Sequence, residues 1–124
     1  MKDEDRLAWH RGERVEGGIR TAVAAYCRDR AAAKALYGPI ASWDTSEITH
    51  MPWLFQGQCE FNEDISPWDV GRVRDMEFMF WNATAFNQQL GGSWATSTAD
   101  KGFMFYGSSG SIVGMTNNNM GTPK

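Results

Sequence analysis

Apolar and polar positions recur along this chain with a period of about 25 residues. Large apolar residues return at the same place in two successive segments, and two polar residues recur with them. The recurring pairs are Trp43 and Trp68, Met51 and Met76, Phe55 and Phe80, Phe61 and Phe86, Asp44 and Asp69, and Asn62 and Asn87. A shared period over so many uncommon residues indicates a stacked repeat architecture.

A third segment keeps only part of this pattern. Trp94 lies one position further from Trp68 than the period places it, and Ala95 stands where the earlier copies have Asp. An inserted glycine and a shortened ATSTADKG stretch account for the shift. The sequence therefore predicts two full repeats and one degenerate repeat over 40–109, followed by an irregular tail over 110–124.

Two local patterns are expected within a repeat. The stretches 61–65 and 86–90 have apolar ends and polar middles, which predicts short strands stacked in parallel about 4.8 Å apart. The apolar spacing over 73–80 fits a short helical turn with one face inward. Large rings at corresponding positions then lie over one another, and the stacking of Trp43 on Trp68 is the central prediction.

The segment before the repeats, 18–39, is rich in Ala and has apolar residues at helical spacing. It predicts a helical cap, because the first repeat of a stack otherwise exposes its apolar edge. Asp29 is placed to break the segment into helices over 19–28 and 30–36. Gly38, followed by Pro, ends the second helix.

Charge and length narrow the possible functions. A chain of 124 residues is most simply one domain. Its first 35 residues, which begin with a charged flexible arm over 1–17, hold eight Lys and Arg against six Asp and Glu, and the rest holds four against nine. An acidic repeat region argues against a nucleic-acid partner. No apolar run approaches the roughly 20 residues of a membrane span.

The start of the chain lacks the apolar region of a secretory signal. The sequence therefore predicts either a protein that stays inside the cell or a chain that lacks its natural N-terminus. Two cysteines, Cys27 and Cys59, are too few for a disulfide framework, so two free, partly buried thiols are expected. His10 and His50 show no metal-ligand spacing, and no metal or cofactor is expected.

The stretch WDVGRVRDMEFMFWNATAFNQQL and its partial copy WDTSEITHMPWLFQGQCEFNEDI resemble the BspA-type leucine-rich-repeat surface proteins. Their microbial units run W-D-V-S-x-V-T-x-M-x-x-M-F-x-x-A-x-x-F-N-x-x-I. The lead-in AVAAYCRDRAAAKALYGPIASWD resembles the helical segment ahead of such repeats, so the resemblance covers about 19–109. It implies an α/β repeat solenoid with leucine-rich-repeat-like coils and a helical N-terminal cap. It also implies a secreted or cell-surface role in adhesion or protein binding, without catalytic residues.

Trp81 and Tyr106 follow a core Phe in consecutive repeats, at a position that Gln56 holds in the first copy. A position that accepts Gln, Trp and Tyr is expected to be partly exposed. The pair is therefore a candidate anchor for a protein partner; alternatively, the rings pack beneath a cap or tail. The C-terminal edge of the stack leaves self-association, or a place in a longer repeat array, as an alternative.

The recurring polar residues have structural explanations. The Asp of each Trp-Asp pair is expected to accept a hydrogen bond from the N–H two residues on, and the Asn beside Phe to form an amide ladder between repeats. Asp64, Asp75 and Glu77 leave a carboxylate-dependent hydrolase as a further alternative, which needs a cleft that a short stack does not offer. The stretch 82–84, NAT, matches a glycosylation acceptor, which is relevant only after export.

Overall fold

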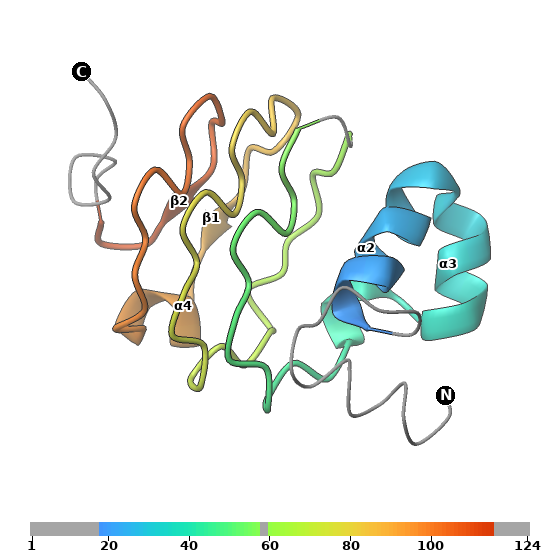
Figure 1. The fold of residues 1–124 in the computed structure, drawn as a ribbon, viewed down its shortest axis with the longest axis horizontal. Helices are drawn as coiled ribbons and strands as arrows, with labels where there is room; N and C mark the ends of the chain where they lie inside the picture. The colour runs from blue at the N-terminus through green and yellow to red at the C-terminus, as the bar shows by residue number, and fades with distance from the viewer. Residues whose placement is uncertain (1–17, 58–59, 116–124) are drawn as a thin grey trace.

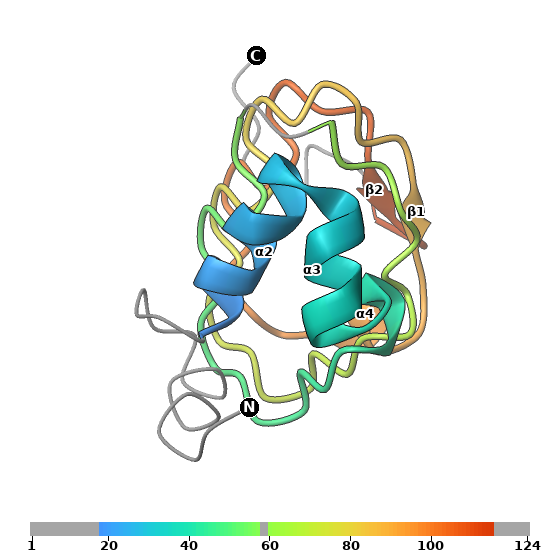
Figure 2. The ribbon, with the colours of Figure 1, turned by 90° about the vertical axis from the view of Figure 1, so that its right-hand side faces the viewer.

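The computed structural model describes residues 18–57 and 60–115. The charged arm expected over 1–17 lies outside that part of the chain, as does the section of the expected tail from 116 onward. Figure 1 shows two helices at one end and loops of chain stacked side by side along the rest. In Figure 2, which looks along the long axis, the helices cover one end of the stacked loops.

The helical segment consists of α2, Ile19–Arg28, and α3, Arg30–Tyr37. The predicted break at Asp29 is confirmed. The backbone of Asp29 is extended, and its carboxylate accepts a hydrogen bond of 3.1 Å from the N–H of Ala32, which is a helix N-cap. The predicted end is also confirmed, because α3 stops at Gly38 with a φ of 81°, a conformation that glycine adopts without strain.

One face of α2 packs on the first loop of the stack. The buried residues of this helix are Ile19, Ala22, Val23 and Tyr26. The ring of Tyr26 meets the ring of Phe61 edge to face, with centroids 5.9 Å apart. On the same helix, the Arg20 guanidinium donates a hydrogen bond of 2.7 Å to the carbonyl of Pro52. The helix therefore covers both apolar and polar groups at this end.

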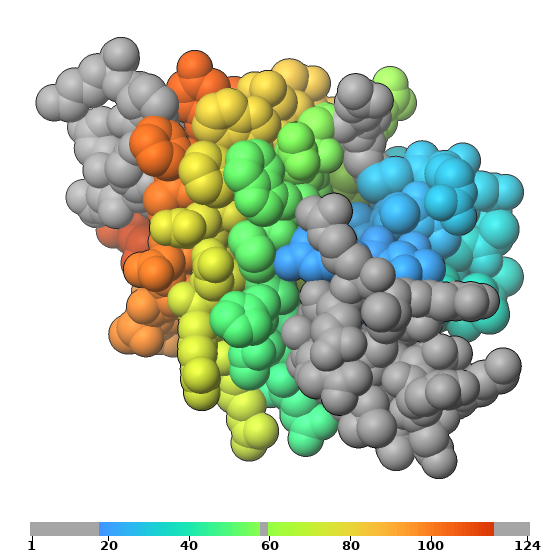
Figure 3. Space-filling model, viewed as in Figure 1, coloured from blue at the N-terminus to red at the C-terminus, as the bar shows by residue number. Residues whose placement is uncertain are grey.

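Beginning with the short 3-10 helix η1, Ile40–Ser42, the chain makes three windings, defined here as residues 40–64, 65–89 and 90–115. They form adjacent bands of colour in Figure 3. Along one side of the stack, alternate backbone N–H groups of each winding donate to carbonyls of the next. Between the first two windings, the donors are Met51, Trp53, Phe55 and Gly57 and the acceptors are Asp75, Glu77, Met79 and Trp81, at 2.8–3.1 Å. Between the second and third, the donors are Met76, Phe78, Phe80 and Asn82 and the acceptors are Asp100, Gly102, Met104 and Tyr106, at 2.7–3.0 Å.

Strands within the windings are shorter than predicted. The strand β1, Gln89–Leu90, pairs in parallel with β2, Ser111–Ile112. The predicted strand over 61–65 is wrong, because the structure has no strand there, and the second predicted strand is too long. A side chain takes over part of the backbone pairing: Asn62 Oδ1 accepts the N–H of Asn87 at 2.8 Å. The strand pattern in the sequence thus marks a contact between windings that is only partly a backbone ladder.

The helical turn predicted over 73–80 is also wrong. Turns cover only 77–80, after a bridge at Asp75, and Phe78 has a left-handed φ of 59°. The predicted inward face is nevertheless confirmed, because Val73, Met76, Met79 and Phe80 are buried. An α-helix uses its N–H groups within itself, whereas alternate N–H groups here donate to the third winding. The third winding does contain one helical turn, α4, Ser93–Thr96.

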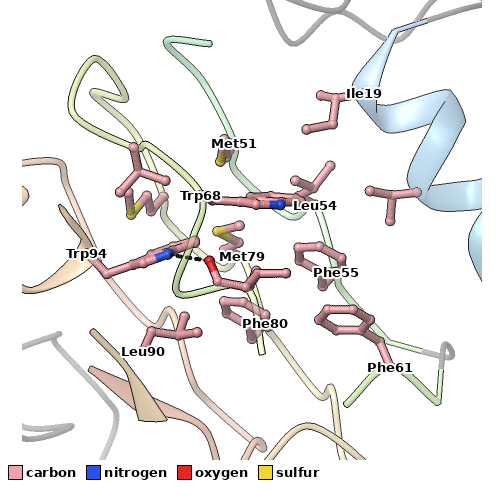
Figure 4. Packing of buried hydrophobic residues seen from close by; sticks show 14 of the residues in the cluster. Ile19, Met51, Leu54, Phe55, Phe61, Trp68, Met79, Phe80, Leu90 and Trp94 are labelled. Carbon is pink, nitrogen blue, oxygen red and sulfur yellow. Dashed lines mark hydrogen bonds between the residues drawn. The ribbon is translucent and has the colours of Figure 1, made fainter. Parts of the chain in front are cut away.

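The stacking of large rings between windings is confirmed. Trp43 lies over Trp68 with centroids 6.3 Å apart, and Trp68 lies 6.4 Å from Trp94. All three side chains are buried. The indole N–H of Trp68 donates to the carbonyl of Ile40 at 2.7 Å. That of Trp94 donates to the carbonyl of Ile65 at 2.9 Å (Figure 4). This inner tryptophan column therefore joins the windings through apolar contact while its polar atoms remain paired.

Phenylalanine columns run beside the tryptophans. Successive stacked pairs are Phe55 on Phe80 and Phe80 on Phe105, each at 5.2 Å, and Phe61 on Phe86, at 5.6 Å. Met51 and Met76 are fully buried next to them. The Phe61–Phe86 column stops in the third winding, where Gly110 lies directly on the ring of Phe86 and leaves no room for a β-carbon. Backbone replaces a third ring at this position.

Candidate functional site

Five half-buried aromatic side chains form a continuous surface on the windings, called here the aromatic face. Its members are Trp53, Phe78, Trp81, Phe103 and Tyr106. Trp53 stacks on Phe78 at 4.2 Å with the planes 4° apart, and Phe78 stacks on Phe103 at 5.4 Å. Trp81 stacks on Tyr106 at 4.4 Å and meets Trp53 at 6.0 Å. Contacts of this kind favour fixed ring positions.

The backbone holds three of these residues in a conformation that bulky side chains rarely adopt. The φ angles of Trp53, Phe78 and Phe103 are 64°, 59° and 55°. A left-handed residue other than glycine costs roughly 1–2 kcal/mol, and such residues cluster at functional sites. Hydrogen bonds from the N–H groups of Trp53 and Phe78 to the next winding, at 3.1 and 3.0 Å, hold two of the three in place. At three positions, an aromatic residue therefore has a backbone conformation in which glycine is less strained.

The aromatic face also carries unused hydrogen-bond donors. Within the described part of the chain, the indole N–H groups of Trp53 and Trp81 and the hydroxyl of Tyr106 have no hydrogen-bond partner. In the inner column, by contrast, each indole N–H is bonded to a backbone carbonyl. The face therefore combines ring surface with donors that are free to bind acceptors on another molecule.

A groove adjoins the aromatic face at Trp53. It lies between α2 and the first winding and has a volume of about 610 Å³. Arg20 and Arg28 of α2 line it on one side, and Trp53 and Gln56 line it on the other. The groove thus adds two cationic side chains to the end of the aromatic face nearest the helices.

The structure brings together the two site residues predicted from the sequence. Trp81 and Tyr106 are in contact on neighbouring windings, and both are half-buried. Sequence reasoning missed Phe78 and Phe103 as members of the same surface. A signal for them exists, because with Trp53 they form an aromatic series spaced by one repeat, one position before a buried aliphatic series.

The two aspartates of the Trp-Asp pairs close turns, as predicted. Asp44 Oδ1 accepts the N–H of Ser46 at 3.0 Å, and Asp69 Oδ1 accepts the N–H of Gly71 at 2.9 Å. The amide ladder is confirmed at Asn62, which also accepts from the Gln88 side chain at 3.1 Å. This ladder lies on the surface rather than in the core, because Asn62 is exposed.

The carboxylates considered for hydrolysis have similar local roles. Asp64 accepts the N–H of Ser66 at 2.9 Å, and Asp75 accepts the N–H of Glu77 at 2.9 Å. Hydrogen bonds from the Ser66 hydroxyl and N–H lower the pKa of Asp64 below its usual value, whereas a general acid needs a raised pKa. None of these carboxylates lines the groove beside α2 or a smaller groove near Arg72.

Cys27, near the end of α2, is disulfide-bonded, so the predicted free thiol is wrong at this position. The chain's other cysteine, Cys59, lies outside the described residues. A count of two cysteines excludes a framework but is sufficient for a single cross-link.

No group of three or more His, Cys, Asp or Glu side chains that could hold a metal ion occurs among the described residues. No helix within 18–57 and 60–115 has the length and apolar character to cross a membrane.

Comparison with known proteins shows the family. Residues 28–117 match the model of a family described as "Mycoplasma protein of unknown function, DUF285". No curated protein and no solved structure matches the chain. The matched residues take in α3 and all three windings, which is well over half of the sequence. The chain therefore belongs to the DUF285 family.

Proposed function

We propose that this chain is a non-catalytic protein-binding module, built as a leucine-rich-repeat-like solenoid with a helical cap and similar to the BspA-type surface proteins. One observation carries the proposal: the aromatic face presents five stacked, half-buried rings on three windings. Tyr and Trp are enriched where protein surfaces meet, because one side chain supplies both apolar area and a polar group.

The strain at this surface supports the same role. Phe78 and Phe103 keep a left-handed backbone although their rings are only half-buried. Their contribution to the core is therefore smaller than that of the buried rings, while the conformational cost remains. A partner that covers these rings increases the apolar area removed from water.

The disulfide at Cys27 supports a location outside the reducing cytosol. Disulfides persist in secreted, periplasmic and cell-surface proteins and are rare in the cytosol. This agrees with the cell-surface or secreted role that the resemblance to BspA-type proteins implies.

The experiment that tests the proposal removes the two half-buried rings that carry a polar group, those of Trp81 and Tyr106. The Trp81→Ser/Tyr106→Ser double variant is expected to keep the parent circular dichroism spectrum and to lose partner capture in a pull-down read by mass spectrometry. Leu36→Ser is the matched control, because Leu36 is 74% exposed on α3, away from the aromatic face. Equal capture by the folded double variant and the parent contradicts the proposal.

Self-assembly through the aromatic face is the second candidate. The face is aromatic and its members include no charged side chain, so two copies can pair it with itself across a two-fold axis. This candidate predicts oligomers in light scattering that grow with concentration and disappear in the double variant. A monomer over the whole concentration range eliminates it.

A further inference from the structure

The hydrogen bonds between windings have one direction along 51–57 and the equivalent stretches of the later windings. Here each winding donates alternate N–H groups toward the C-terminal end of the stack, and the next winding supplies the carbonyls. The three described windings therefore differ at their two outer edges. Along this side of the stack, the first winding presents acceptors to α2, and the third presents donors at the opposite end.

The donors of the third winding are unpaired in the described part of the chain. One repeat on from the donors of the second winding stand Lys101, Phe103, Phe105 and Gly107, and none of these N–H groups has a hydrogen-bond partner. We call this set the donor row. Unpaired backbone groups at a sheet edge are a template for another chain, and pairing of these groups is the rule in folded proteins.

The acceptor next to this row is already in use. The carbonyl of Arg74 accepts the N–H of Asp100, and the corresponding carbonyl in the third winding is that of Ala99. It accepts a hydrogen bond of 3.0 Å from Lys101 Nζ, which also donates to the carbonyl of Ser97 at 2.7 Å. The edge is thereby left with donors along 101–107.

The polarity of this edge excludes a second copy as its natural occupant. Two copies that meet edge to edge place donors against donors. A head-to-tail arrangement needs the carbonyl row of the first winding, but α2 packs against that winding and Arg20 already occupies the Pro52 carbonyl at 2.7 Å. The occupant must instead bring an uncovered row of carbonyls.

We propose that the donor row binds an uncapped stretch of the same repeat carried by a separate polypeptide. The chain itself contains the model for this contact, because the carbonyls of 75–81 fit the donors of the first winding, and those of 100–106 fit the donors of the second. The bound stretch follows the left-handed turn at Phe103 and continues the stacks that now end at Phe103 and Tyr106. The donor row borders the aromatic face and shares Phe103 with it, but the unpaired N–H groups and not the rings carry the inference, so it does not rest on the proposed function.

Residue-resolved amide hydrogen exchange on the full chain tests the donor row. Its four amides are expected to exchange at least about tenfold faster than the equivalent paired amides of the second winding. Those paired amides are Met76, Phe78, Phe80 and Asn82. A synthetic peptide with the sequence of 70–84, VGRVRDMEFMFWNAT, is expected to slow exchange in the donor row and to leave the second winding unchanged. A scrambled peptide is expected to slow neither.

A pair of substitutions at one donor makes the test specific. Lys101→Pro removes an N–H that has no partner within the described chain, and the preceding Asp100 lies in a parallel bridge, an extended conformation compatible with a following proline. Lys101→Ala removes the same side chain but keeps the N–H. We expect peptide affinity to fall roughly tenfold in Lys101→Pro and to be at least the parent value in Lys101→Ala.

Three results overturn the inference. Slow exchange of the donor row in the free chain at low concentration means that the chain's own residues already cover it. Protection that appears with protein concentration alone identifies a second copy as the occupant. Loss of peptide binding in the Trp81→Ser/Tyr106→Ser variant, with Lys101→Pro binding normally, assigns the peptide to the aromatic face instead.

Discussion

Two tryptophan-containing columns run through the windings with the same period but differ in burial, in hydrogen bonding and in the distance between their rings. The inner column of Trp43, Trp68 and Trp94 is buried, and each indole N–H is bonded to a backbone carbonyl. The outer column begins at Trp53, is half-buried, and has no such bond within the described residues. The outer rings stack more closely, at 4.2 and 5.4 Å against 6.3 and 6.4 Å.

This difference shows that stacking and burial are separate properties of a repeat. A constant period brings equivalent side chains over one another wherever they point. The backbone decides which column faces inward, and the outer column coincides with the left-handed residues Trp53, Phe78 and Phe103. The inner column is thus explained by stability, whereas the outer column needs a further reason, which we assign to binding.

The largest expected effect is at the middle of the inner column. Trp68→Ala removes a buried ring that stacks on both sides, and we expect the free energy of unfolding to fall by about 3–5 kcal/mol. Chemical denaturation followed by circular dichroism measures this change. An unchanged midpoint contradicts the assignment of Trp68 to the core.

A smaller effect isolates the hydrogen bond of the inner column. Trp68→Phe keeps an aromatic ring but removes the shorter of the two hydrogen bonds to the carbonyl of Ile40, which still accepts the N–H of Trp43 at 3.2 Å. We expect a loss of about 0.5–1.5 kcal/mol, measured as above, with Trp94→Phe as a parallel case at Ile65, whose carbonyl likewise keeps the N–H of Trp68. If Trp68→Phe is as stable as the parent, the bond contributes nothing and the two columns differ only in exposure.

In the outer column, the comparison between alanine and glycine reports the backbone strain. Both Phe103→Ala and Phe103→Gly lose the stacking on Phe78, but only glycine relieves the left-handed φ of 55°. We expect the glycine variant to be more stable than the alanine variant by about 1 kcal/mol. The opposite order, which is usual elsewhere, means that Phe103 is not strained in solution.

The mildest test is hydrogen–deuterium exchange at the indole N–H groups, which needs no substitution and leaves the stability of the protein unchanged. The indole N–H groups of Trp43, Trp68 and Trp94 are expected to exchange slowly with deuterium, and those of Trp53 and Trp81 rapidly, in ¹⁵N-resolved NMR spectra. Bonded, buried groups exchange only through opening of the structure. Slow exchange at Trp81 in the free protein means that its indole is covered and removes it from the proposed binding surface.

The sequence predicted those features that depend on local chemistry or on the period. The break at Asp29 follows from a capping side chain, and the stacking of Trp43 on Trp68 follows from their spacing. The strand over 61–65 and the helical turn over 73–80 were wrong, because hydrogen bonds to a neighbouring winding, and in one place an Asn side chain, replace the regular patterns.

The candidate site was predicted in part. Trp81 and Tyr106 were identified because their repeat position, which Gln56 holds in the first copy, accepts both polar and aromatic residues. Phe78 and Phe103 escaped, because a phenylalanine in a repeat looks like a core residue and only the positive φ places its ring at the surface. The disulfide at Cys27 was also missed, since pairing depends on distance in the fold and not on the number of cysteines.

The contact of Gly110 with the ring of Phe86 sets a rule for engineering longer versions of this protein. Backbone occupies the position of the next phenylalanine in the Phe61–Phe86 column, so in a duplicated unit appended after 115 the counterpart of Phe86 has no ring on which to stack. A copy of 65–89 inserted immediately before residue 90 keeps every phenylalanine column continuous. It also leaves Gly110 in its place at the end of the Phe61–Phe86 column. Elongation of this scaffold therefore proceeds from the middle.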